Sequence, residues 1–122
     1  MPRKQQAVAT KKIVEFVVDV LDDFKIEELT CLDVRHLTSI TDVMIIGSGR
    51  SDRHVRAAAD NLIEKCKEFG YTPLGIEGQE SGEWVLVDLA DVIVHLMLPR
   101  TREFYDLEKL WDIARPQGKA VE

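Results

Sequence analysis

The segment Gly47-Ser48-Gly49-Arg50-Ser51 has the composition of a phosphate-binding turn. A glycine-rich turn between a strand and a helix can present backbone N–H groups to a phosphate. The segment lacks the Lys-Ser or Lys-Thr pair of a P-loop, and its glycines do not follow the G-x-G-x-x-G spacing. A plain strand-to-helix turn is therefore the favoured interpretation, and nucleotide binding is the alternative.

Nucleotidyl transfer at that turn would need clustered carboxylates to hold a metal ion. Asp52 is the only acid nearby, and Arg53 stands where a paired acid would be wanted. His36, His54 and His95 form no short-spaced ligand pair, and no nucleophile adjoins a base. His95 lies in an apolar strand, where a hydrogen-bonded histidine is expected rather than a base. We predict no catalytic residue, no metal site and no cofactor, with a nucleotidyltransferase-like enzyme as the alternative.

A tryptophan-bearing strand gives a stronger signal of binding. Strand alternation places Trp84, Leu86 and Asp88 on one face, with Val85 and Val87 on the other. The valine side is expected to face the core. The Trp84 side is apolar too, so a helix or another protein must cover it. Tryptophan carries much of the binding energy in protein interfaces, and both kinds of cover stay open.

The last predicted helix follows Pro99, with Thr101 as its N-cap. Its apolar stripe consists of Phe104, Leu107, Trp111 and Ala114. Tyr105 and Glu108 lie one helical step apart and off this stripe. We expect these two side chains to face solvent or a partner.

Apolar periodicity predicts the elements that must position these residues. Helices are expected at about 7–24, 52–69 and 102–114, and strands at 29–34, 43–46, 71–77, 83–87 and 92–98. A parallel crossover is expected from 43–46 to 71–77, and an antiparallel hairpin from the last two strands. The predicted fold class is α/β, with a mixed sheet of about five strands flanked by helices. One domain is expected over 1–122, with a core at about 7–114 and a loose tail at 115–122.

The first predicted helix has a wide apolar stripe. Val14 and Val18 extend it beyond what one core contact needs. A deeply seated helix is the favoured interpretation, and a homodimer through this face is the alternative.

Composition limits the class of partner. The chain carries 16 basic and 22 acidic residues, a formal net charge of −6. Binding nucleic acid through many phosphate contacts needs a basic face, so little direct nucleic-acid binding is expected. An acidic protein can still dock on a basic one. No apolar run approaches the roughly 20 residues of a membrane span, so no membrane contact is expected. Cys31 and Cys66 are expected to be buried, reduced thiols of a cytoplasmic protein.

Several short motifs occur in a fixed order along the chain. They are Asp33-Val34, Thr41-Asp42, Gly47-Ser48-Gly49-Arg50-Ser51, Arg53-His54-Val55, Glu77-Gly78, Trp84-Val85-Leu86-Val87-Asp88, Asp91-Val92-Ile93-Val94-His95 and Arg102-Glu103-Phe104-Tyr105-Asp106-Leu107-Glu108-Lys109-Leu110-Trp111. With these motifs the chain resembles the ribosomal silencing factor, or Iojap, family from about Leu32 to Trp111. The ordered set at these spacings is highly specific.

The resemblance implies a nucleotidyltransferase-like core that lacks catalytic acids, and a protein that is not an enzyme. It implies binding to the large ribosomal subunit through ribosomal protein fourteen. That contact would sterically block joining of the subunits and repress translation under nutrient limitation, and the family is also connected with large-subunit assembly. The family's contact surface carries over onto Trp84, Leu86, Asp88, Tyr105 and Glu108.

One residue departs from the family pattern. Ala90 stands in the hairpin where the family usually has glycine. Glycine adopts φ > 0 freely and alanine does not, so the turn type is left open. The residues of the last strand that share a face with Trp84 depend on that turn.

Overall fold

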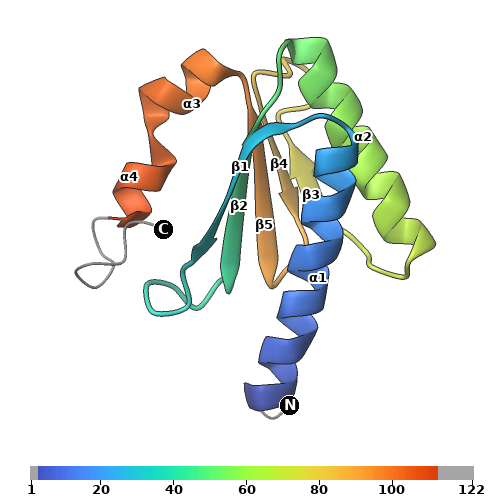
Figure 1. Cartoon of the computed structure of the whole chain (residues 1–122), viewed down its shortest axis with the longest axis vertical. Coiled ribbons are helices and arrows are strands. Elements are labelled where there is room, and N and C mark those ends of the chain that lie inside the picture. The colour runs from blue at the N-terminus through green and yellow to red at the C-terminus, as the bar shows by residue number, and fades with distance from the viewer. Residues whose placement is uncertain (1–2, 113–122) are drawn as a thin grey trace.

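The computed structural model describes residues 3–112 and shows a five-stranded sheet with helices on both faces (Figure 1). The elements are α1 (Arg3–Asp23), β1 (Glu27–Asp33), β2 (Val43–Ser48), α2 (Asp52–Glu68), β3 (Gly75–Glu77), β4 (Trp84–Asp88), β5 (Val92–Met97), α3 (Pro99–Tyr105) and α4 (Leu107–Asp112). The predicted mixed α/β architecture is confirmed. None of the helices within 3–112 has both the length and the apolar character that a membrane crossing requires.

The sheet order is β1-β2-β5-β4-β3. β2 and β5 run parallel, and the other neighbouring pairs are antiparallel, including the predicted hairpin of β4 and β5. These pairings make β3 run in the direction of β2, as predicted, although two strands separate them. β3 is shorter than expected because Tyr71 N–H still bonds to the carbonyl of Cys66 in α2, and Pro73 has no N–H to donate.

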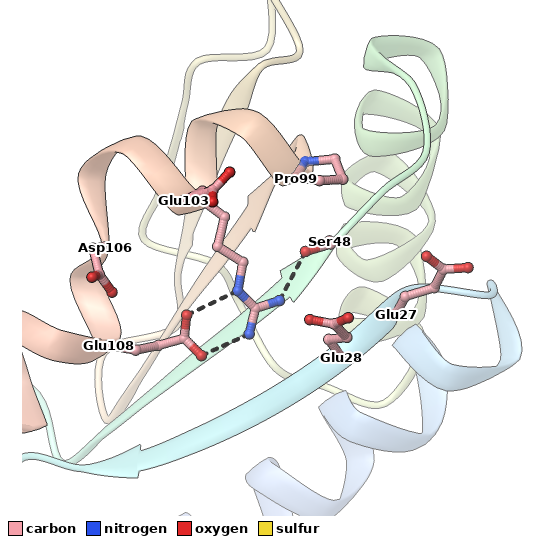
Figure 2. Close-up of a pocket in the computed structure, with 8 residues that line it drawn as sticks. Glu27, Glu28, Ser48, Pro99, Glu103, Asp106 and Glu108 are labelled. Atoms are coloured by element: carbon pink, nitrogen blue, oxygen red, sulfur yellow. Dashed lines mark hydrogen bonds and ion pairs between the residues drawn. The ribbon is translucent and has the colours of Figure 1, made fainter.

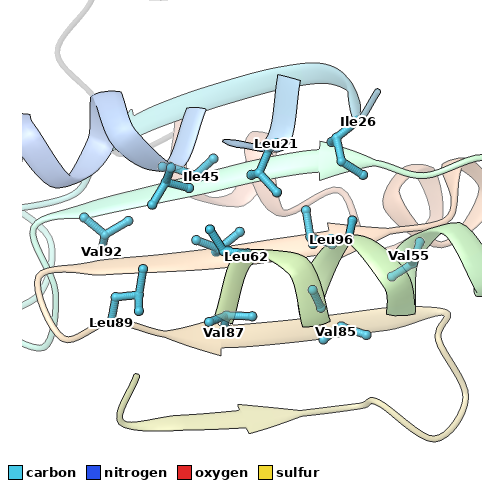
Figure 3. Close-up of a cluster of buried hydrophobic side chains, with 14 of the residues drawn as sticks. Leu21, Ile26, Ile45, Val55, Leu62, Val85, Val87, Leu89, Val92 and Leu96 are labelled. Atoms are coloured by element: carbon cyan, nitrogen blue, oxygen red, sulfur yellow. The ribbon is translucent and has the colours of Figure 1, made fainter. Parts of the chain in front are cut away.

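Helices α1 and α2 cover one face of the sheet, which we call the core face (Figure 3). Its fully buried side chains include Val17 and Leu21 of α1, Val55, Ala58, Ala59, Leu62 and Cys66 of α2, and Ile45, Val85, Val87, Val92, Val94 and Leu96 of the strands. The prediction that Val85 and Val87 face the core is confirmed. The fully buried centre of this face is therefore almost entirely aliphatic.

The two helices of the core face end as their sequences indicate, with one exception. Val14 and Val18 pack against the edge of the core, which accounts for the wide apolar stripe on α1. The homodimer stays a prediction.

Gly70 follows the C-cap of α2 and has a φ of 87°, a conformation that favours glycine after the end of a helix. Helical spacing from Leu62 and Cys66 predicts a buried Phe69, which is wrong. Phe69 is the C-cap, 67% exposed, and its ring meets Phe16 edge-on.

Strand β1 forms one edge of the sheet and is irregular near its start. Its register against β2 shifts between Glu27 and Thr30, and Glu28 has a φ of 51°. This is a β-bulge, in which one extra residue bends the strand. Cys31 lies on this edge and is exposed, so only Cys66 fulfils the expectation of a buried thiol; both cysteines are free.

The opposite face of the sheet, which we call the Trp84 face, lies under α3 and α4. Its buried apolar residues are Leu32, Val34, Met44, Ile46 and Met97, with Trp84 and Leu107 packed against them. This face is also apolar, but the helices over it are short.

The prediction of one continuous last helix was wrong. The chain breaks at Asp106, which has a left-handed φ of 50°, so α3 and α4 are separate. The N-cap is Leu98 rather than Thr101, because Pro99 suits the first helical turn. Phe104, expected on the buried stripe, is 79% exposed. The Trp111 side chain, Ala114 and the expected tail at 115–122 lie outside the described residues.

Candidate functional site

Arg102 of α3 links the C-terminal helices to the Trp84 face through hydrogen bonds. Figure 2 labels two of its partners, Ser48 and Glu108. Its guanidinium donates to Ser48 Oγ at 2.8 Å and to Thr30 Oγ1 at 3.1 Å. It also forms a bidentate pair with Glu108, with Nε–Oε1 at 3.0 Å and Nη2–Oε2 at 2.8 Å. One side chain thus joins β1, β2, α3 and α4. Paired hydrogen bonds of this kind fix geometry as well as charge.

The Arg102 pair affects the charge of the surface around it. The hydrogen bonds from Arg102 hold the pKa of the Glu108 carboxyl below its usual range. Glu108 therefore stays ionised, and its charge is largely matched by Arg102. A hollow of about 340 Å³ beside the pair is also lined by Glu27, Glu28, Glu103 and Asp106. With one arginine against five acids, this end of the molecule is acidic.

Trp84 lies half-buried on β4, between the sheet and α3. Its indole Nε1–H donates to His95 Nδ1 at 2.9 Å. Its ring centroid lies 4.8 Å from that of Tyr105, within the range of favourable aromatic contact. Register explains the first contact, because Leu86 pairs with His95 and Trp84 is the next residue on the same face. The indole is thus contacted by His95 of β5 and by Tyr105 of α3.

The aromatic contacts continue to the surface. Phe104 meets Tyr105 edge-on at 5.0 Å between ring centroids. Tyr105 is 53% exposed and Phe104 is 79% exposed. We define the aromatic surface as Trp84, Leu86, Phe104 and Tyr105. Exposed, clustered aromatic side chains are typical of protein-binding surfaces.

The five residues predicted as a contact surface occupy different environments. Trp84 and Leu86 are half-buried on the expected face of β4, and Tyr105 contacts Trp84. Asp88 is also on this face, but its Oδ1 accepts from Ala90 N at 2.8 Å and so supports the hairpin. Glu108 is engaged with Arg102. The structure therefore brings Trp84, Leu86 and Tyr105 together and gives the two acids structural contacts as well.

Ala90 adopts the conformation that the sequence left open. Its φ is 73°, which lies in the left-handed region that favours glycine. Alanine at this position therefore has a strained backbone. The N–H of Ala90 is satisfied by the Asp88 carboxylate, and Leu89 N–H bonds to Val92 O at 2.9 Å. The resulting register places Ile93, His95 and Met97 on the face of Trp84.

Sequence patterns did not predict the contacts of Arg102 or the exposure of Phe104. Arg102 is buried although it belongs to a charged stretch, and its partners Ser48 and Thr30 are remote in sequence. Phe104 has helical spacing with Leu107, which made it look buried. The positions of Pro99 and Asp106 were the available signals for two short helices. Nothing in the spacing points to the Arg102 contacts.

The glycine-rich turn has a structural explanation. A Cβ on Gly47 would lie 2.5 Å from Ile26 Cγ2, and one on Gly49 would lie 2.6 Å from Val55 Cγ2. The N–H of Gly49 bonds to Met97 O, and that of Arg50 bonds to His54 Nδ1, both at 3.0 Å. These two N–H groups are therefore already paired within the protein. Such pairing favours the interpretation of a plain turn over phosphate binding.

Ser51 is the N-cap of α2, because its Oγ accepts a hydrogen bond from His54 N–H at 3.1 Å. Asp52 in the first turn pairs with Arg56 at 3.0 Å rather than with another acid. Over residues 3–112, no group of three or more His, Cys, Asp or Glu side chains comes together as metal ligands.

Comparison with known proteins identifies the family. The model of the family described as "Ribosomal silencing factor during starvation" matches residues 7–122. The chain belongs to this family. Its members are regulators associated with the ribosome, and the resemblance seen in the sequence motifs is confirmed.

Individual relatives agree with this assignment. A ribosomal silencing factor of Haemophilus influenzae is 48% identical over 99 residues, which span 81% of this chain and 97% of the relative. A crystal structure of a Chromobacterium violaceum protein matches with a TM-score of 0.82 and 43% identity, covering 92% of each chain. The mouse protein named mitochondrial assembly of ribosomal large subunit protein 1 is 33% identical over 117 residues, which span 92% of this chain and 50% of the relative.

Proposed function

We propose that this silencing factor binds the large ribosomal subunit through ribosomal protein fourteen, with the aromatic surface as the central contact. Bound there, it blocks joining of the small subunit by occupying the same space and so represses translation when nutrients are short. The observation that supports this most is the half-buried Trp84 beside the exposed rings of Tyr105 and Phe104. A protein that regulates the ribosome by binding needs a docking surface. The aromatic surface has the composition that is typical of the centre of a protein interface.

Steric inhibition requires no chemistry. An interface of about 1,200–2,000 Å² that overlaps the subunit contact is sufficient. Trp84, Leu86, Phe104 and Tyr105 would supply its apolar centre. Asp88 and Glu108 would then lie toward the rim of this interface. We also propose that the protein is a regulator without enzymatic activity. The same contact could serve large-subunit assembly, as the name of the mouse relative suggests for that protein.

Charge favours a protein partner over RNA. The chain has a net charge of −6, and the Arg102 hollow adds an acidic rim close to Tyr105. This negative charge accelerates the encounter with a basic protein, and it repels the phosphates of RNA. We therefore propose little direct contact with ribosomal RNA, and action in the cytoplasm, where bacterial ribosomes assemble.

Trp84→Ala tests the proposal. Removing the indole should weaken binding to purified large subunits by at least about 1 kcal/mol, because an aromatic residue at an interface centre carries much of the energy. Binding is measured by co-sedimentation, first with large subunits and then with isolated ribosomal protein fourteen. Subunit joining is followed by light scattering in the same samples.

Phe69→Ala is the matched control, since it removes an exposed aromatic ring at the end of α2, away from the aromatic surface. It should bind and block joining like the natural protein. Circular dichroism and thermal unfolding establish that each variant is folded. A folded Trp84→Ala protein that binds large subunits unchanged would refute the proposed contact, and binding to small subunits instead would refute the proposed partner.

A further inference from the structure

His95 places a polar ring in an apolar part of the sheet. It lies on β5 between Val94 and Leu96, and only 5% of it is exposed. Its cross-strand neighbours are Leu86 on β4 and Ile46 on β2. A leucine or methionine would suit these surroundings, so the presence of histidine needs a reason.

The hydrogen bond with Trp84 fixes the proton on His95. An indole N–H can only donate, so His95 Nδ1 must accept and carries no proton. In the neutral ring the proton is then on Nε2. This atom is buried and has no hydrogen-bonding partner among the described residues. A buried N–H without a partner destabilises a fold, so the favourable polar contact of this ring among the described residues is the one that Nδ1 makes with Trp84.

We propose that His95 is a positioning residue of the ribosome-binding surface, which holds the Trp84 indole in one orientation through its Nδ1 acceptor. This inference rests on the proposed function of the aromatic surface. Because the indole N–H is already bonded inside the protein, the partner meets the ring of Trp84 rather than its N–H. Burial lowers the pKa of His95 to about 4, which keeps Nδ1 available as an acceptor at neutral pH.

Fixing a side chain before binding strengthens an interface. A free indole must lose rotational freedom when a partner arrives, whereas a fixed one has already lost it. The expected effect of releasing one such side chain is about three- to tenfold in affinity. Trp84 also touches Tyr105, so its orientation affects the exposed part of the aromatic surface as well.

Two substitutions of nearly the same shape separate the positioning role from a packing role. His95→Asn keeps a hydrogen-bond acceptor at the place of Nδ1, whereas His95→Leu has none, and both remove the rest of the ring. We expect His95→Leu to be at least as resistant to urea as His95→Asn, because leucine suits the apolar site. We expect the opposite order in binding to large subunits, with His95→Leu about three- to tenfold weaker.

The indole N–H signal of Trp84 in a ¹H–¹⁵N spectrum gives a readout that is independent of the ribosome. Its assignment comes from its loss in Trp84→Phe. The signal should move, and exchange faster with water, in His95→Leu, and should stay closer to that of the natural protein in His95→Asn. A purely structural role would give the two variants the same order in stability and in binding.

The outcomes are distinct. Equal binding by the two folded His95 variants, or an unchanged Trp84 signal in His95→Leu, would overturn the positioning role. If Trp84→Ala itself binds large subunits normally, the proposed function fails. In that case the indole signals alone decide whether His95 positions Trp84.

Discussion

The two faces of the sheet are both apolar, but different interactions cover them. The core face is closed by two long helices whose aliphatic side chains are wholly buried, such as Val17, Leu21 and Leu62. The Trp84 face is covered by two short helices that are fastened by Arg102 and by the contact of Trp84 with Tyr105. The first face is held mainly by nonpolar packing, which is spread over many side chains. The second depends on a few directional contacts, and it carries the exposed aromatic residues.

The difference shows where function can be placed in a small domain. One face supplies most of the stability, so the other can hold features that stability alone would not select. These include a buried histidine, His95, whose Nε2 has no hydrogen-bonding partner among residues 3–112, and an exposed phenylalanine, Phe104. Exposed aromatic rings are tolerated where a partner covers them.

Adjacent residues on β2 give the sharpest comparison of the two faces. Ile45 and Ile46 are both fully buried, but Ile45 faces α1 and α2 and Ile46 faces the Trp84 side. Replacing a buried isoleucine by alanine costs about 2–5 kcal/mol, depending on how far the site can relax. We expect Ile45→Ala near the upper end of this range and Ile46→Ala near the lower end, since the short helices can settle. Urea unfolding measures both; equal losses would show that the faces are equally rigid.

The pH dependence of stability tests the buried histidine. Burial lowers the pKa of His95 from 6.5 to about 4. Between these two pH values the unfolded chain therefore binds more protons than the folded chain. The folded protein keeps its full free energy of unfolding above pH 6.5 with respect to this group, and loses part of it as the pH drops toward 4. The shift corresponds to a loss of about 3 kcal/mol.

His95→Leu should remove this part of the pH dependence, because leucine does not titrate. The measurement is the free energy of unfolding from pH 7 to 4 for the natural protein and the variant, where the difference isolates His95 from the carboxylates. Parallel curves would mean that His95 titrates normally in the fold.

Arg102→Ala should loosen the Trp84 face and leave the core face intact. Breaking a buried ion pair is strongly destabilising, but Glu108 is one-third exposed, so the expected cost is about 2 kcal/mol. Amide hydrogen exchange should accelerate in α3 and stay unchanged in α2. Arg100→Ala, which removes an exposed arginine of the same helix, is the matched control and should alter neither. Equal acceleration in both helices would mean that the two faces unfold together.

The core face could be predicted from the sequence because burial leaves a periodic pattern. Val85 and Val87 on β4, and Leu62 on α2, follow the strand and helix periods, and all are buried. The Trp84 face could be predicted only in part. Alternation placed Trp84 and Leu86 together, but it does not show that Arg102 reaches β1 and β2, across 72 and 54 positions of sequence. Polar contacts of this kind have no period, so only the folded chain shows them.

The bulge at the start of β1 has a consequence for how the protein behaves at high concentration. An edge strand with regular free N–H and C=O groups is a template on which another chain can grow a sheet, and such growth leads to aggregation. In β1 the register shift at Glu27–Thr30 interrupts that template, and the exposed Glu27 and Glu28 place negative charge beside it. Two copies that approached edge to edge would meet mismatched hydrogen bonds and like charges. The protein can therefore reach a high concentration without the β1 edge of its sheet becoming a site of aggregation.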